Sequence, residues 1–235
     1  MRTVVMLLPV SRENPAAALH HRGAEGHVVL RPLAPTDAEE MTRAVEESLP
    51  ELRRFMPWAH LPITLEGQLA RLKTLAADYA AGRSLGMGLF DARTGTMLVN
   101  ISLEPRVPLN PAGWEIGYWT RSGLAGRGMC TLAVRMITLY AFDLLGSDRV
   151  QILTHRENVA SARVAEKCGF RLEAELENVV AAPAADHVRA GLSADPITLS
   201  WVMVPRTYAL VPWAATLRRG MVVENLLGQA ITGWC

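Results

Sequence analysis

The stretch that decides the fold is residues 114–133, WEIGYWTRSGLAGRGMCTLA. Its first part, residues 114–119, is rich in aromatic side chains and predicts a β-strand. The loop Gly123 to Gly128 follows, and an amphipathic helical pattern begins at Met129. Small residues let the backbone approach a ligand closely, and the first N–H groups of a helix lack partners within the helix. Together with the helix dipole, they predict a phosphate site at residues 126–130.

Two other phosphate-binding motifs fit this loop less well. A Walker loop requires Gly-Lys-Ser/Thr, which the sequence lacks here. A dinucleotide fingerprint would have Thr131 in place of its third glycine, with Asp148 about where the ribose-binding acid belongs. The polar Glu115 and Tyr118 in the preceding segment are unlike a fully buried parallel strand. A dinucleotide-dependent enzyme is therefore the weaker alternative.

Helical and strand patterns flank this centre on both sides. Helices are expected at about 37–48, 65–81, 129–144 and 158–168. Thr36 and Glu39 predict a capping box at the start of the first helix. Strands are expected at 28–31, 85–91, 97–103, 149–155, 170–177 and 197–204. Loops are expected at 11–27 and 181–195, and the apolar residues 221–231 suit a helix.

Composition excludes several classes of protein. The chain has 235 residues, of which 50% are hydrophobic and 20% charged, as in an ordinary globular protein. A net charge of +1 gives no electrostatic case for a DNA partner. Cys130, Cys168 and Cys235 lie far apart, which favours a reducing compartment, the cytoplasm. No apolar run reaches the length of a membrane span, and the histidines lack a metal-ligand spacing, so neither membrane nor metal is expected.

Taken together, these segments resemble the GNAT acetyltransferases, and within them the RimJ/RimL-type branch. The resemblance covers roughly residues 28–178. It rests on the ordered segments 30–33, 55–58, 115–119, 125–130, 158–161 and 166–173. It implies an α/β (α+β) GNAT fold, with a mixed, mostly antiparallel, twisted sheet of six to seven strands and about four helices. The central strands would diverge into a V. The chain departs from the usual loop pattern at Ala125 and Cys130.

The resemblance also implies that acetyl-CoA binds in this V. The backbone of Trp119, Thr120 and Arg121 would pair with the pantetheine arm like an extra strand. The N–H groups of the glycine loop would hold the pyrophosphate; the loop residues are Ala125, Gly126, Arg127, Gly128, Met129 and Cys130. Asn158 would bind the pantetheine amides, or serve chiefly as a helix N-cap.

Candidate catalytic and acceptor-binding residues follow from the chemistry of amine acetylation, which needs a neutral amine and a route for protons. Glu115 is the candidate general base, either directly or through water, and otherwise an exposed strand residue or ion-pair partner. Ser161 resembles the family's serine and would protonate the departing thiolate, unless it is a plain helix-surface residue. The acceptor pocket is expected to be lined by aromatic residues that otherwise belong to the core: Phe55, Trp58, Trp114 and Tyr118.

The sequence thus predicts an N-acetyltransferase that transfers acetyl directly from acetyl-CoA to an amine. A protein N-terminus fits the resemblance best, and a small-molecule amine is the other acceptor. The alternative is a non-catalytic module that binds acyl-CoA. Three parts are expected: an N-terminal arm (1–27), the acetyltransferase domain (28–204), and an extension (205–235) that packs on the domain or forms a homodimer.

Overall fold

The computed structural model describes residues 5–6, 18–23, 26–105, 110, 112–180 and 183–224. Within these ranges the chain forms one ten-stranded sheet, in the order β1-β10-β2-β3-β4-β5-β6-β7-β9-β8. The strands are β1 (Val5–Met6), β2 (Ala18–Gly23), β3 (Gly26–Pro32), β4 (Leu85–Asp91), β5 (Met97–Glu104), β6 (Gly113–Thr120), β7 (Arg149–His155), β8 (Arg171–Glu177), β9 (Ile197–Met203) and β10 (Met221–Glu224). All neighbouring pairs are antiparallel except β1–β10 and β6–β7. The mixed, mostly antiparallel fold is confirmed, with more strands than the six or seven expected.

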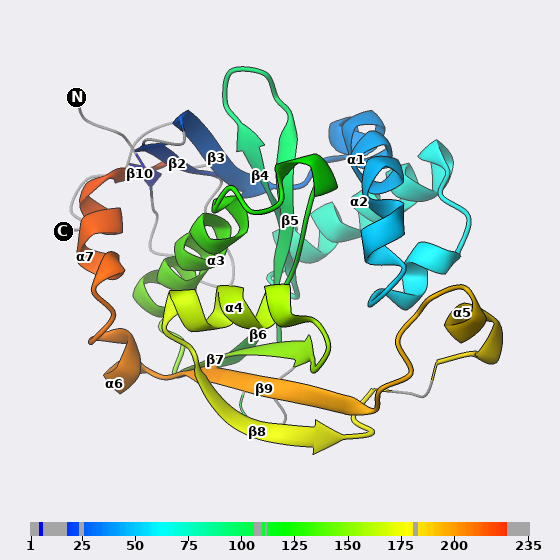
Figure 1. Ribbon diagram of the computed structural model, residues 1–235. Coiled ribbons are helices and arrows are strands. Elements are labelled where there is room, and N and C mark those ends of the chain that lie inside the picture. Colours follow the sequence, from blue (N-terminus) through cyan, green and yellow to red (C-terminus); the bar gives the residue numbers. More distant parts are fainter. Residues whose placement is uncertain are drawn as a thin grey trace.

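Helices cover both faces of this sheet (Figure 1). The helices of the described chain are α1 (Ala38–Leu52), α2 (Leu65–Ala80), α3 (Met129–Leu139), α4 (Val159–Cys168), α5 (Ala185–Arg189), α6 (Pro205–Tyr208) and α7 (Trp213–Arg219). Helices α1 and α2 close one apolar core, while α3 packs on β5 and β6 over the other and α4 lies beside α3. None of the described helices has the length and apolar character that crossing a membrane requires.

The start of α1 differs from the prediction. A short 3-10 helix, η1 (Pro35–Asp37), precedes α1, and no side chain caps α1 itself. The expected capping box between Thr36 and Glu39 is therefore wrong. Instead, the carboxylate of Asp37 accepts hydrogen bonds from the backbone N–H of Ala34 at 2.8 Å and from Arg31 at 2.7 Å. Asp37 ties this end of α1 to β3, an interaction between elements that a local capping pattern does not contain.

The sheet extends on both sides of the range 28–204 that the sequence assigns to the domain. Residues 18–23, expected to be loop, form β2 between β3 and β10. Residues 221–224, expected to begin a helix, form β10, while residues 225–231 of that expected helix lie outside the described residues. The expected loop 181–195 contains the short helix α5. The boundaries at 27 and 204 remain predictions.

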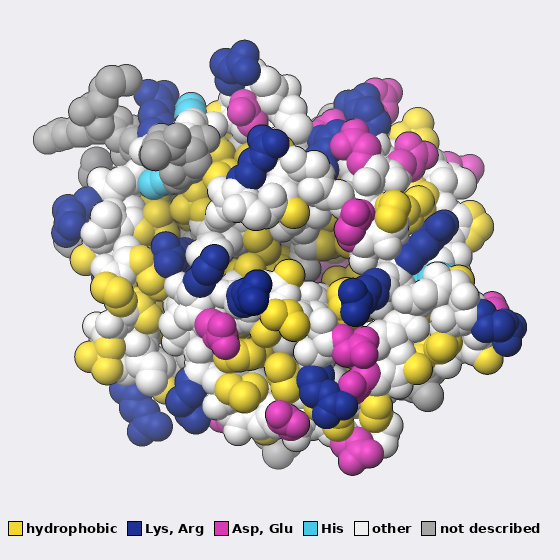
Figure 2. Space-filling model, viewed as in Figure 1, with side chains coloured by type: hydrophobic (Ala, Val, Ile, Leu, Met, Phe, Trp, Pro, Cys, Tyr) yellow, Lys and Arg dark blue, Asp and Glu magenta, His cyan; other side chains and the backbone are white. Residues whose placement is uncertain are grey.

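The strands β6 and β7 diverge in the middle of the sheet. They run parallel and pair only where Gly113–Glu115 lies beside Arg149–Gln151. Beyond this point β6 continues on β5 as far as Thr120, and β7 continues on β9 as far as His155. In the view of Figure 1, the molecular surface is hollowed between the α3–α4 side and the α1–α2 side (Figure 2). The sheet therefore opens into the V that the resemblance implies.

Candidate active site

Beyond Glu115, no described strand pairs with the edge of β6 that faces the opening. The backbone N–H of Arg121 donates to the carbonyl of Leu98 on the β5 side at 3.1 Å. Since an antiparallel ladder alternates, Trp119 and Arg121 direct their backbone groups to β5, and Tyr118 and Thr120 direct theirs to the opening. Trp119, Thr120 and Arg121 were expected to pair with pantetheine. Of these three, only Thr120 directs its backbone N–H and C=O groups to the opening, and Tyr118 does the same.

The glycine loop ends at the N-terminus of α3 in a conformation that suits a ligand. Gly126 and Gly128 have φ of 77° and 82°, a region that glycine adopts readily. A Cβ built at either position meets no described atom within 4 Å, so the loop is open on that side. No described side chain caps α3, which leaves its first N–H groups available to an anion. The loop that contains the predicted residues Ala125 to Cys130 therefore fits a diphosphate.

The side chain of Arg121 is held by α1. Its guanidinium donates to Glu47 at 2.6 Å and to Glu40 at 2.7 Å. Next to it, the Ser122 backbone N–H donates to Ser48 Oγ at 3.1 Å. These bonds tie the start of the cofactor loop to α1. The Arg121 side chain is accordingly engaged by carboxylates and does not point at a phosphate site.

A hydroxyl pair connects β6 to α4 on the α3–α4 face. The Ser161 Oγ donates to the Tyr118 hydroxyl at 3.0 Å, and that hydroxyl donates to the Ser161 carbonyl at 3.0 Å. Burial raises the pKa of Tyr118, so the phenol stays protonated at neutral pH. The Asn158 side chain accepts from the Ser161 N–H at 3.1 Å and so caps α4. Tyr118, expected in the acceptor pocket, is therefore a neighbour of the predicted acid.

Cys130 lies in the first turn of α3, where a helix N-terminus can lower the pKa of a thiol. The effect of burial is larger and raises the pKa of this thiol to about 11, although a hydrogen bond with Thr120 opposes it. The side chain is partly exposed at the surface, yet protein atoms surround the sulfur closely enough to desolvate a thiolate. Cys130 is thus a thiol at neutral pH and a poor nucleophile.

Glu115 lies on the other face of β6, the face of α1 and α2. Strand alternation places it with Trp119, whose indole is buried in the α1–α2 core. Its carboxylate accepts a hydrogen bond from Gln151 Nε2 at 3.1 Å, and it stands opposite Glu104 in the β5–β6 register. Glu115 is half-buried and is the last residue of β6 that pairs with β7 before the two strands diverge.

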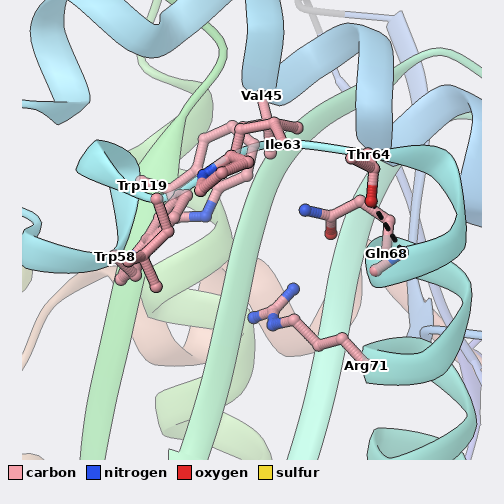
Figure 3. A pocket seen from close by; sticks show the side chains of 10 residues that line it. Val45, Trp58, Ile63, Thr64, Gln68, Arg71 and Trp119 are labelled. Carbon is pink, nitrogen blue, oxygen red and sulfur yellow. Dashed lines mark hydrogen bonds between the residues drawn. The ribbon is translucent and has the colours of Figure 1, made fainter.

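A cavity of about 210 Å³ lies on this same face, between α1, α2 and β6 (Figure 3). The rings of Trp58 and Trp119 form one wall, with centroids 6.4 Å apart and planes tilted by 50°. Gln68 and Arg71 point into it from α2. The remaining lining residues are Val45, Leu61, Pro62, Ile63, Thr64 and Gly67.

The structure brings together only some of the residues expected in the acceptor pocket. Trp58 lines the cavity, whereas Trp114 is buried in the core of the opposite face. Phe55 does not line it and instead packs against His155, with ring centroids 5.5 Å apart. Sequence analysis missed Gln68 and Arg71. The available signal was a polar pair spaced i, i+3 on one face of the helix predicted at 65–81.

A glycine loop at a helix N-terminus beside a split, mostly antiparallel sheet defines the class of CoA-dependent acyltransferases. The family described as "Acetyltransferase (GNAT) domain" matches residues 27–171, more than half of the chain. The chain therefore belongs to the GNAT family and is an acetyl-CoA-dependent acyltransferase. This finding and the antiparallel sheet overturn the alternative of a dinucleotide-dependent enzyme. Among the described residues, no cluster of His, Cys, Asp or Glu is placed to hold a metal ion.

Known proteins of similar sequence and structure agree with this assignment. The Bacillus subtilis (strain 168) protein "Probable N-acetyltransferase YjcK" is 31% identical over 147 residues, which is 62% of this chain and 81% of YjcK. Mycobacterium smegmatis RimJ in complex with CoA-disulfide has a TM-score of 0.72 at 20% identity, over 88% of this chain and 97% of RimJ. The ribosomal-protein-S5-alanine acetyltransferase from Vibrio fischeri has a TM-score of 0.67 at 16% identity, over 79% and 96% of the two chains. The fold is that of the RimJ/RimL-type enzymes.

Proposed function

We propose that this enzyme transfers acetyl directly from acetyl-CoA to a primary amine that binds in the cavity beside Trp58 and Trp119. One observation carries the proposal: β6 has a free backbone edge next to the glycine loop, and its α1–α2 face carries both Glu115 and the cavity. The name of the ribosomal-protein-S5-alanine acetyltransferase favours a protein as acceptor, and we propose its N-terminal α-amine. A small-molecule amine is the other acceptor that this site would take.

Each candidate residue has a distinct task in this proposal. Acetyl-CoA supplies an electrophilic thioester. Glu115 takes a proton from the attacking amine, directly or through one water, and the bond from Gln151 keeps the carboxylate oriented. The Ser161 hydroxyl lies on the opposite side of β6, where it donates to Tyr118. It would turn from Tyr118 and give its proton to the sulfur as the C–S bond breaks, and it would regain a proton from solvent while Glu115 releases the amine proton to solvent. Backbone N–H groups at the free edge of β6 would polarise the thioester carbonyl.

The test combines an acceptor panel with the variant Glu115→Gln. We expect release of free CoA with peptides or small amines, and a turnover number reduced about 10²-fold or more in the variant, because the base is lost. Acetyl-CoA affinity should be unchanged, since Glu115 does not line the glycine loop. The defect should shrink at high pH, where the amine is already neutral.

Glu66→Gln is the matched control, because Glu66 is an exposed carboxylate in the first turn of α2. It should leave turnover unchanged. Equal activity of Glu115→Gln and the wild type at every pH would remove Glu115 from the mechanism. Tight acetyl-CoA binding without turnover across the whole panel would favour the non-catalytic module instead.

A further inference from the structure

The cavity beside Trp58 and Trp119 has a largely apolar wall with three polar side chains, of which Thr64 caps α2 through the backbone N–H of Gly67. Gln68 and Arg71 lie one turn apart on α2, and both point into the cavity (Figure 3). Facing them are the two indoles and the aliphatic side chains of Val45 and Ile63. Polar groups in an apolar pocket fix the orientation and the identity of a ligand. Gln68 and Arg71 therefore indicate which chemical groups the acceptor carries.

Gln68 lacks a hydrogen-bond partner for its side-chain oxygen within the described chain. The residue is 8% exposed, and its Oε1 is buried without a donor. A buried carbonyl oxygen without a donor is unfavourable, so such groups are rare in folded proteins. An N–H group of a ligand in the cavity would satisfy this oxygen.

Arg71 lacks an ion-pair partner within the described residues. Two other arginines on this side of the molecule do have ion-pair partners: Arg121 pairs with Glu40 and Glu47, and Arg83 pairs with Asp78. Although Arg71 is open to solvent, nearby protein atoms desolvate its guanidinium enough to lower its pKa, and Glu104 opposes this without lying at ion-pair distance. An unpaired guanidinium at the wall of an apolar cavity is suited to bind an anion, above all a carboxylate in bidentate geometry.

We propose that the acceptor is an amine that also carries a carboxylate, and that Arg71 binds this carboxylate while Gln68 Oε1 accepts an N–H of the same molecule. The proposal rests on the proposed acetyl transfer and adds the substrate class. The apolar part of the acceptor packs on the indoles of Trp58 and Trp119. A peptide with an acidic side chain near its N-terminus and a free amino acid both present this chemistry.

The experiment compares matched pairs of acceptors that differ only in charge. One arm uses peptides with Glu or Gln at the second position, and the other uses amino acids and their carboxamides. For the wild type we expect kcat/KM to be about tenfold or more higher for the charged member, mostly through KM, because hydrogen bonds to charged groups are the stronger ones. The arm with the larger ratio identifies the source of the carboxylate.

Substitutions on α2 assign the preference to a residue. Arg71→Gln should bring the ratio within each pair close to one. Lys73→Gln removes the same charge two residues away, from an exposed side chain that does not line the cavity, and should keep the wild-type ratio. Arg71→Lys should retain part of the preference, since it keeps the charge but not the bidentate geometry.

The outcomes separate this proposal from the proposed function. Equal kcat/KM within every pair would overturn the carboxylate preference and leave acetyl transfer intact. If no acceptor is acetylated, acetyl transfer to these amines fails, and calorimetric binding of the same pairs in the presence of CoA still decides the role of Arg71. Tighter binding of the charged member that is lost in Arg71→Gln supports the proposal; equal binding overturns it.

Discussion

Tyr118 and Trp119 lie on opposite faces of β6, and neither has the role that the sequence analysis predicted for it. Residues 114 and 118 point to one face of β6, and residues 115 and 119 point to the other. The sequence shows this parity, but it does not show which face meets α1 and α2. Trp119 therefore lines the cavity although it was expected to serve the cofactor, and Trp114 and Tyr118 do not line it.

The hydroxyl pair gives a prediction at this scale. Ser161→Ala removes the proposed proton donor and should lower kcat about 10²-fold, because the thiolate then leaves without a proton. Acetyl-CoA affinity should remain, since the Asn158 side chain still caps α4 through the backbone N–H of residue 161. Steady-state kinetics and equilibrium binding measure the two quantities.

Ser193→Ala is a suitable control, because Ser193 donates to the exposed Glu157 and lies outside the hydroxyl pair. An unchanged kcat in Ser161→Ala would exclude Ser161 as the proton donor. A lowered kcat in Tyr118→Phe would then assign the proton to the Tyr118 hydroxyl, and an unchanged kcat in both variants would assign it to water.

At the scale of elements, the sequence predicts segments whose signals are local. The bounds of β4 and β7 agree with the expectation, and the end of α2 differs by one residue, because the pattern that predicts each of them is local in the sequence. β10 was missed because its partners β1 and β2 lie far away in the sequence, whereas β2 was missed although it forms a local hairpin with β3. The glycine loop was predictable because strand, loop and helix are consecutive, whereas the cavity joins α1, α2 and β6.

The glycine loop supplies a prediction with a close internal control. Gly128→Ala and Gly95→Ala both place a side chain at positive φ, 82° and 72°, where no described atom lies within 4 Å of the new Cβ. Both variants should therefore lose similar stability, on the order of 1–2 kcal/mol. Only Gly128→Ala should lose acetyl-CoA affinity, because its methyl group stands where the diphosphate would lie.

Thermal unfolding and calorimetric titration with acetyl-CoA test this pair of variants. Gly95 lies in the turn between β4 and β5, remote from α3. Wild-type affinity in Gly128→Ala would contradict the loop assignment. A loss of affinity in both variants would point to general destabilisation.

At the scale of the whole molecule, the ion pairs of Arg121 join the α1–α2 side to the cofactor loop. The hydrogen bond from Arg121 holds the pKa of Glu47 below its usual value of 4.5. A carboxyl group with a lowered pKa in the folded state stabilises the fold above its unfolded pKa. This contribution is lost as the pH falls through the lower, folded-state value.

Arg121→Gln should consequently lower the melting temperature at pH 7, and this effect should shrink as the pH falls below 4.5 and Glu47 becomes protonated. Arg83→Gln breaks an exposed ion pair with Asp78 and should change the melting temperature little at either pH. Melting curves across this pH range provide the measurement. An equal loss at pH 7 and pH 3.5 would show that packing, not charge, is what the arginine contributes.

The remaining predictions about the whole molecule concern its assembly and location. A homodimer through residues 205–235 is a prediction for light scattering on the full chain and on a truncated one. The cytoplasmic location likewise stays a prediction from cysteine usage. Local sequence patterns do not determine either property, because dimerisation depends on a second copy of the chain and location depends on the cell.

The divergence of β6 and β7 has a consequence for the life of the protein in a cell. A strand edge without a neighbour leaves backbone groups that only water satisfies, and a thioester arm laid along it would complete the ladder. A ligand that binds only the folded chain raises its stability in proportion to the logarithm of its concentration. The folded enzyme would then be most stable where activated acetate is abundant.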